Sequence, residues 1–290
     1  MAAEQSTARA ETKAFAGGPS PSEPGWAVLH LFQRIDRGRW GATPEPERRA
    51  GIEELASLLS SWQGEEGLQL VPLGVIGKAD FGLLAVHPDV HRVQRLTQEL
   101  AATRLGACLE TVHAFLSLSE VSEYMSTAGD HARKLIDEQG LAPDSPEFQQ
   151  QVSGFARRMA SYADARVHPQ LPGSDYPVIC FYPMAKARGE DRNWYALSFE
   201  ERKRLMGQHA DSGRRYAGRV TQLITSATGI DDWEWGVTLF SRDLKSLRDI
   251  VYEMRYDEGS ALYGQFGAFY VGVRFAPGEL AETLQLDPKG

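Results

Sequence analysis

Two segments, one in each half of the chain, share one sequence pattern. Residues 81–93 read Phe-Gly-Leu-Leu-Ala-Val-His-Pro-Asp-Val-His-Arg-Val, and residues 235–247 read Trp-Gly-Val-Thr-Leu-Phe-Ser-Arg-Asp-Leu-Lys-Ser-Leu. Each has an apolar run of strand length, then an aspartate suited to a helix N-cap, then apolar residues at helical spacing. The pattern predicts duplication of one α+β unit; the alternative is chance similarity of two amphipathic segments. We therefore predict an α+β fold of two tandem ferredoxin-like units, with joined sheets and helices outside.

This interpretation divides the chain into four segments. Residues 25–125 form the first unit, residues 126–175 a connector with one helix, and residues 176–280 the second unit. The connector helix is expected to begin at Ser145, because serine at the N-cap and proline at the first helical position form a good start signal. Residues 1–24 are rich in Ala, Ser, Glu and Pro and have no apolar signal-peptide core, so we predict a disordered tail.

Hydrophobic spacing predicts the individual elements. The expected strands are 26–32, two within 68–87, 109–118, 177–183, 234–241, 249–256 and 268–275. The expected helices are 46–62, 89–102, 145–164, 198–228, 243–248 and 258–265.

Composition limits the functional classes. The formal charge of −8 argues against a nucleic-acid-binding protein, and no stretch reaches the roughly 18 apolar residues of a membrane helix. The two cysteines, Cys108 and Cys180, form no Cys-x-x-Cys motif, which fits a reducing compartment and predicts a cytoplasmic protein. The chain also lacks a P-loop and a Gly-x-Ser-x-Gly motif.

One histidine is expected on the apolar side of the helix that begins at Ser198. Residues spaced by three or four share this side: Leu205, Met206, His209, Gly213, Tyr216 and Val220. A histidine in such a place is more often a satisfied core residue. However, Gly207 and Gly213 flank His209, and helix-interior glycines are costly unless a large group approaches closely. A neutral imidazole is a normal axial ligand of haem iron, so His209 is a candidate ligand.

A tyrosine and a lysine are expected on one face of a strand. Tyr182 follows an apolar run, and Pro183 indicates that the strand leaves its ladder there. Period-two alternation puts Tyr182, Met184 and Lys186 on one face if the extended chain continues. A phenol and an ammonium so placed could reach one carboxylate. The alternative is a tyrosine that caps the core beside a solvated lysine.

Four more polar residues are candidates for binding carboxylates: Arg214, Gln222, Arg255 and Ser260. The arginine fork suits a carboxylate, although single arginines are usually solvated surface groups. Arg255 is expected at the end of an apolar strand, and Ser260 in the helix that follows.

With these residues in view, residues 176–275 resemble the C-terminal half of the chlorite dismutase-like superfamily, and within it the coproheme decarboxylases that make haem b. The matching strings are Tyr-Pro-Met-Ala-Lys (182–186), Asn-Trp-Tyr (193–195), Gly-Arg-Arg-Tyr-Ala-Gly (213–218) after His209, Asp-Asp-Trp-Glu-Trp-Gly-Val-Thr-Leu-Phe (231–240) and Tyr-Glu-Met-Arg-Tyr-Asp-Glu-x-Ser-Ala (252–261). Residues 25–125 resemble the degenerate N-terminal repeat more loosely. The resemblance implies a dimeric α/β barrel-type arrangement of the two units and assembly into a homopentamer.

The resemblance also implies roles for three central residues. His209 stands where the family has its proximal iron ligand, and Tyr182 stands at the tyrosine that becomes a radical. Lys186 matches the lysine that contacts the reacting propionate. Glu253 and Glu258 are both candidates for the carboxylate that supports the proximal histidine.

The remaining residues correspond to the rim and distal side of the porphyrin. Arg255, Ser260 and Arg214 match propionate binders. Gln222 stands where true chlorite dismutases have a distal arginine, which argues against chlorite as the substrate. His168 matches the distal base of some family members.

The activity implied is peroxide-dependent oxidative decarboxylation of two propionates of iron coproporphyrin III (coproheme) to vinyl groups, which gives haem b. Coproheme and hydrogen peroxide are then the partners, and no separate cofactor is needed because the iron porphyrin is itself the substrate. Two alternatives stay open: a chlorite-degrading or peroxidase-type haem enzyme, and a non-enzymatic haem-binding protein.

Overall fold

The computed structural model describes residues 25–286, so the tail expected at residues 1–24 lies outside the described residues. The N-terminal half contains β1 (Ala27–Ile35), α1 (Arg37–Ala42), α2 (Glu45–Gln63), β2 (Gln69–Val75), β3 (Phe81–His87), α3 (Val90–Ala102) and β4 (Leu109–Ser119). Two connecting helices follow, α4 (Ala128–Asp137) and α5 (Pro146–Val167). The C-terminal half contains β5 (Val178–Lys186), α6 (Phe199–Arg214), β6 (Val220–Ser226), β7 (Trp235–Ser241), α7 (Leu244–Met254), α8 (Glu258–Tyr263), β8 (Gly264–Phe266), β9 (Tyr270–Arg274) and α9 (Leu280–Thr283).

The described strands form one antiparallel sheet in the order β7-β6-β4-β1-β3-β2-β9-β5-β8, and β7 also pairs with β5. The four main strands of the N-terminal half lie in the order β4-β1-β3-β2, and those of the C-terminal half in the order β9-β5-β7-β6. If the four main strands of each half are numbered along the chain, both halves have the same spatial order: fourth, first, third, second. The halves join at short seams: Leu118 and Ser119 of β4 pair with β6, and Leu73 to Val75 of β2 pair with β9. The mixed α+β class is therefore confirmed.

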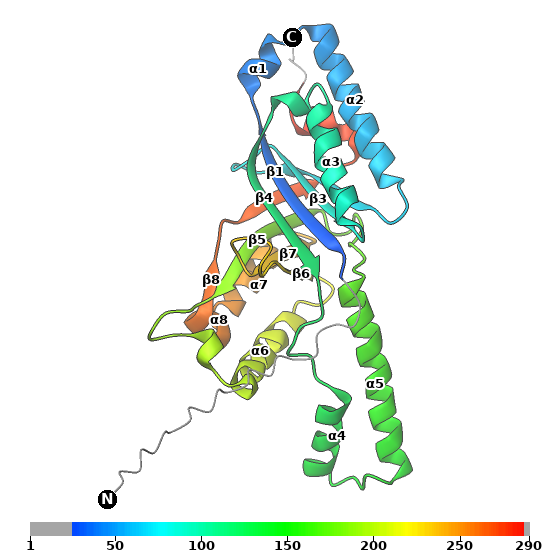
Figure 1. Ribbon diagram of the computed structural model, residues 1–290, viewed down its shortest axis with the longest axis vertical. Coiled ribbons are helices and arrows are strands. Elements are labelled where there is room, and N and C mark those ends of the chain that lie inside the picture. Colours follow the sequence, from blue (N-terminus) through cyan, green and yellow to red (C-terminus); the bar gives the residue numbers. More distant parts are fainter. Residues whose placement is uncertain (1–24, 287–290) are drawn as a thin grey trace, which may run out of the picture.

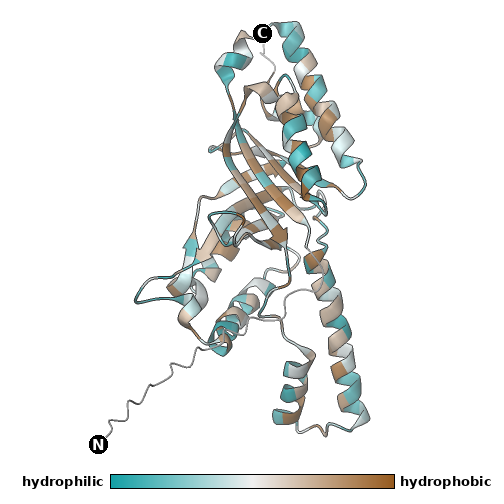
Figure 2. Ribbon diagram, in the orientation of Figure 1, coloured by the Kyte–Doolittle hydropathy of each residue, from teal (hydrophilic) through white to brown (hydrophobic). Residues whose placement is uncertain are grey.

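Helices cover the outer faces of the strands (Figure 1). A separate hydrophobic core, called the central core below, contains residues of strands from both halves. Leu55 of α2 and Leu96 of α3 belong to the core on the N-terminal strands, whereas Leu247 of α7 belongs to the core on the C-terminal strands. Figure 2 shows the strands as mainly hydrophobic and α4 and α5 as largely polar, extending away from the body. On β5, Phe181 contributes to the central core and Tyr182 to the core beneath the C-terminal helices. Tyr182 thus faces the C-terminal helices.

The two segments with the shared pattern form the same local structure. β3 leads to α3 through Asp89, whose carboxylate accepts from the backbone N–H of His91 at 2.9 Å. β7 leads to α7 through Asp243, whose carboxylate accepts from the backbone N–H of Ser246 at 2.6 Å. The prediction of strand, aspartate cap and helix is confirmed at both places. Duplication of one unit remains a prediction.

Three element predictions were wrong. The helix expected at 198–228 ends at Arg214, because Gly218 with a φ of +78° turns the chain and residues 220–226 pair with β7 as β6. Residues 249–254 continue α7 rather than forming a strand, because Leu247 and Ile250 bury one helical face. The polar stretch at 126–144 contains α4, whose start is fixed by a capping box between Thr127 and Asp130.

Among residues 25–286, no helix combines the length and the hydrophobicity needed to cross a lipid bilayer.

Candidate functional site

His209 lies on α6 and is tied to the short helix α8. Its Nδ1 lies 3.1 Å from Oδ2 of Asp257, the residue before α8, and 3.4 Å from Oγ of Ser260. Burial lowers the pKa of His209, and nearby Lys186 lowers it further, while Asp257 opposes both effects. The imidazole is therefore neutral near pH 7, with Nδ1–H donating to Asp257. Because the two ring nitrogens diverge, Nε2 is directed away from that carboxylate.

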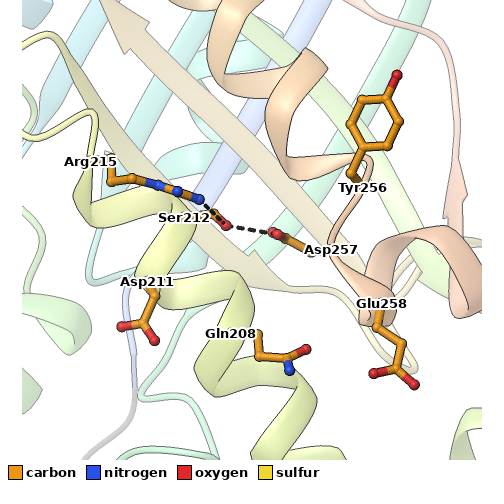
Figure 3. Close-up of a pocket in the computed structure, with 7 residues that line it drawn as sticks. All are labelled: Gln208, Asp211, Ser212, Arg215, Tyr256, Asp257 and Glu258. Atoms are coloured by element: carbon orange, nitrogen blue, oxygen red, sulfur yellow. Dashed lines mark hydrogen bonds between the residues drawn. The ribbon is translucent and has the colours of Figure 1, made fainter.

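Asp257 forms a bridge between α6 and α8. Its second oxygen, Oδ1, accepts from the hydroxyl of Ser212 at 2.7 Å, and Arg215 donates to the same hydroxyl at 2.9 Å (Figure 3). These residues line a hollow of roughly 640 Å³, together with Gln208, Asp211, Tyr256 and Glu258. The three carboxylates of this lining outnumber its single arginine. A porphyrin with several propionates would be repelled there, so we place the candidate site on the Nε2 side of the histidine.

Lys186 ends β5 and is almost fully buried, with 7% of its surface exposed. Its ammonium donates to the Gly259 carbonyl of α8 at 3.0 Å and lies 4.3 Å from the centre of the Trp194 ring. Burial lowers the pKa of Lys186 to about 8, and the charge of Glu234 limits this decrease. Lys186 and His209 therefore meet at the first turn of α8.

Tyr182 lies on the same face of β5 as Met184, as the alternation predicts. Its side chain is 9% exposed and stacks on Phe269, with ring centres 4.4 Å apart. Burial raises the pKa of the Tyr182 phenol, so the hydroxyl is protonated at any physiological pH.

Gln222 lies on β6 and faces α6. A Cβ built at Gly213 would lie 3.3 Å from Nε2 of Gln222, so the glycine allows close packing at this point. Gly213 is one turn after His209, on the same side of α6. Ile224, two residues after Gln222, packs against the core that contains Tyr182. The fold thus brings Tyr182, Lys186, His209, Gln222 and Ser260 to one side of the C-terminal strands.

The other predicted residues are not part of this group. Arg214 is exposed (69% of its side chain) and pairs with Asp211. Arg255 is not at a strand end but is the exposed C-cap of α7, 5.7 Å from the Tyr252 ring centre. Their propionate-binding roles remain predictions.

His168 lies at the end of α5, beside the start of β1. Its Nδ1 is 2.9 Å from a carboxylate oxygen of Asp164, and its ring centre is 5.3 Å from that of Trp26. Trp26 packs against the central core rather than the core that contains Tyr182. The role of His168 as distal base therefore remains a prediction.

The sequence left open which carboxylate supports His209, and neither of the two candidates, Glu253 and Glu258, contacts it. Glu253 instead accepts from the hydroxyl of Tyr216 at 2.6 Å, and Glu258 pairs with Arg204 at 3.0 Å. Asp257, the residue that contacts His209, stands between them in the sequence. The local sign of it in the sequence is an acidic residue directly before the expected short helix, whereas the contact itself depends on how α8 packs against α6.

Comparison with known proteins agrees with this fold. The sequence profile of the family described as chlorite dismutase matches residues 48–275. The chain therefore belongs to the chlorite dismutase family. A solved heme-binding protein from Thermus thermophilus is 34% identical, with a TM-score of 0.75, and the match covers 93% of this chain and 98% of that one. Chlorite dismutase from Candidatus Nitrospira defluvii, solved with imidazole, is 18% identical with a TM-score of 0.66, covers 91% and 96%, and shows the fold alone.

Two archaeal relatives are longer than this chain. A protein of Natronomonas pharaonis with the provisional name heme-binding protein is 35% identical over 275 residues, which are 93% of this chain and 42% of that protein. A protein of Halobacterium salinarum with the same provisional name is 37% identical over 268 residues, which are 90% of this chain and 49% of that one. The chain thus spans less than half the length of these relatives.

Proposed function

We propose that this chain binds coproheme and, with hydrogen peroxide, decarboxylates two of its propionates to give haem b. The observation that carries the proposal is the meeting of His209, Ser260 and Lys186 at the first turn of α8, on the side of the strands that presents Tyr182. Similarity to proteins named as heme-binding supports the porphyrin.

The histidine fits an iron porphyrin. Metal-binding histidines usually donate their other ring N–H to a carboxylate, which fixes the ring and increases its basicity. Asp257 holds Nδ1 of His209 in this way and leaves Nε2 for iron. The lowered pKa of His209 keeps the ring neutral, as a ligand must be.

The lysine fits a propionate. A carboxylate removed from water needs a charged or hydrogen-bonded partner, and Lys186 offers an ammonium in partly apolar surroundings. Its present acceptor is one neutral carbonyl, that of Gly259, so the ammonium can also donate to a carboxylate. Ser260, one residue further along α8, has its hydroxyl 3.4 Å from Nδ1 of His209, so its part in holding a propionate rests on the family resemblance alone.

Tyr182 fits a hydrogen-atom relay. Peroxide oxidises the iron centre of the substrate by two electrons, and the Tyr182 phenol gives one hydrogen atom to that oxidised centre. The resulting phenoxyl takes one hydrogen atom from the β-carbon of a propionate; the carbon radical then passes one electron to the same centre, and the carbon–carbon bond to the carboxylate breaks to release carbon dioxide and leave a vinyl group. Each round consumes one peroxide and one proton and yields one carbon dioxide and two waters. A phenol whose pKa is raised by burial keeps the hydrogen atom that this relay requires.

The second candidate is a haem-binding protein without this activity, which the names of the relatives favour. Gln222 in place of an arginine argues against chlorite as the substrate, because a neutral amide attracts an anion less strongly than a guanidinium.

One experiment separates the two candidates. Purified protein is incubated with coproheme and peroxide, and the mass of the porphyrin product is measured by mass spectrometry. We expect stepwise loss of two carboxyl groups in the wild type, and coproheme binding with almost no vinyl product in Tyr182→Phe. Normal turnover in Tyr182→Phe would remove the relay, and binding without mass loss in the wild type would favour the carrier.

We also propose that the halves are two ferredoxin-like units arranged as a barrel-type fold, which their shared strand order supports. The homopentamer remains a proposal from the family resemblance, and the cytoplasmic location remains a proposal from the two cysteines. Light scattering with size-exclusion chromatography tests the number of subunits.

A further inference from the structure

One buried carboxylate next to the candidate site has no role in the proposed reaction. Glu234 lies just before β7 and is only 6% exposed. Its Oε2 accepts from the backbone N–H of Lys186 at 2.8 Å, and its Oε1 pairs with the guanidinium of Arg188. Its own backbone is fixed as well, because its N–H donates to the Met184 carbonyl at 3.1 Å. A buried carboxylate is costly unless both oxygens are used, and here both are.

We propose that Glu234 is a positioning residue for Lys186: it holds the last residue of β5 so that the ammonium is kept beside α8. The inference rests on the proposed function for the role of Lys186 in binding a propionate. The contacts of Glu234 with Lys186 and Arg188, on which the positioning role is based, do not depend on the proposed function.

The reason lies in where the ladder of β5 ends. Lys186 is the last residue of the strand: on one edge it still pairs with Gly264 of β8, but on the other edge the ladder with β7 ends at Met184. Side chains at strand ends are mobile unless their backbone is held. Glu234 supplies an acceptor for the Lys186 N–H on one side, and Arg188 closes the clamp on the other.

The surroundings of the ammonium explain why such a clamp matters. Its near neighbours are the Gly259 carbonyl and the face of Trp194, and neither is an anion. Glu234 is the carboxylate whose charge offsets the burial of Lys186, whereas His209 on α6 is a neutral neighbour. Without the clamp, the flexible lysine would lower its free energy by turning toward water.

The test uses the protein without porphyrin. The rate at which each lysine reacts with an amine-acylating reagent is measured by mass spectrometry in the wild type, Glu234→Ala and Glu234→Gln. We expect Lys186 to react slowly in the wild type and at least about tenfold faster in Glu234→Ala. Glu234→Gln keeps one oxygen for the Lys186 N–H and should restore most of the protection.

Two other lysines serve as internal controls. Lys203, which pairs with Asp130 at 2.6 Å, and Lys245, which is 83% exposed, should react at unchanged rates in all variants. Equal reactivity of Lys186 in the wild type and Glu234→Ala overturns the proposal, as does a rise that affects Lys203 equally. If Glu234→Ala does not fold, Arg188→Gln provides the same test with a smaller expected rise, because Arg188 is on the exposed side of the clamp.

A second readout uses turnover. Glu234→Ala should reduce kcat for decarboxylation more than it raises KM, and Glu234→Gln should recover most of kcat. If the wild type binds coproheme without decarboxylating it, the proposed function fails. The labelling of Lys186, which is measured without porphyrin, still tests the positioning role of Glu234.

Discussion

Replacing Asp257 by asparagine tests the assignment of His209 most directly. The substitution keeps the shape of the side chain and an oxygen for Nδ1–H of His209, but it removes the negative charge 3.1 Å from that nitrogen. A hydrogen bond to a charged group contributes about 1.5–3 kcal/mol, and one between neutral groups about 1 kcal/mol. The difference is about 0.5–2 kcal/mol. Since about 1.4 kcal/mol is tenfold, the expected loss of affinity is roughly tenfold. Loss of a group that supports a metal ligand typically costs about 10- to 100-fold, which agrees with this figure.

The assay is titration of the protein with ferric coproheme, followed at the Soret band. We expect Asp257→Asn to weaken binding about tenfold and to shift the band, because the imidazole becomes a poorer donor. Ser212→Ala is the matched control: it removes the bond at 2.7 Å to the other oxygen of Asp257 and the bond from Arg215, but it leaves the charge of Asp257 beside His209, so its effect should be clearly smaller. Identical affinity and identical spectra in the wild type and Asp257→Asn would refute the placing of iron at Nε2 of His209.

Three further outcomes are expected. Decarboxylation should decline as pH rises through about 8, because Lys186 is charged below its pKa of about 8 and neutral above it; a flat kcat/KM profile from pH 7 to 9 would contradict this. Gly236→Ala should destabilise the fold by about 1–3 kcal/mol in urea unfolding, since its Cβ would lie 2.6 Å from the fully buried ring of Phe115; unchanged stability would show that the ring moves freely. Asp130→Asn should reduce the stability of the contact between α4 and α6 by about 1 kcal/mol or less, because Asp130 accepts from Lys203 at 2.6 Å. Equal rates of proteolysis within α4 in the wild type and the variant would contradict this. The Lys203 contact lowers the pKa of Asp130, so this stabilisation is present above the carboxyl's unfolded-state pKa and is lost as pH falls toward its folded value.

The sequence predicted strongly periodic elements well and mixed segments poorly. The runs before Asp89 and Asp243 are apolar and almost continuously buried, each is followed by a clear helix cap, and both formed as expected. Residues 249–254 combine β-branched and aromatic residues, which favour a strand locally, yet burial of Ile250 against the C-terminal strands makes them helical. Tertiary packing outweighed local preference there.

The features of the candidate site also differ in how far the sequence predicts them. The face shared by Tyr182 and Lys186 follows from the two-residue period of a strand, so the sequence contained it. The contact of Asp257 with His209 depends on where α8 packs against α6, and no local pattern encodes that distance. The same holds for Glu234, which reaches Lys186 only because β7 pairs with β5.

The alternation along β5 constrains how this protein can change during evolution. Phe181 fills the central core and Tyr182 faces the helices, so an insertion or deletion of one residue in the strand would exchange the two sets of side chains. The proposed chemistry and the packing of both halves would then be lost together. Relatives that keep the fold should therefore tolerate length changes in the loops on either side of β5 but not within it.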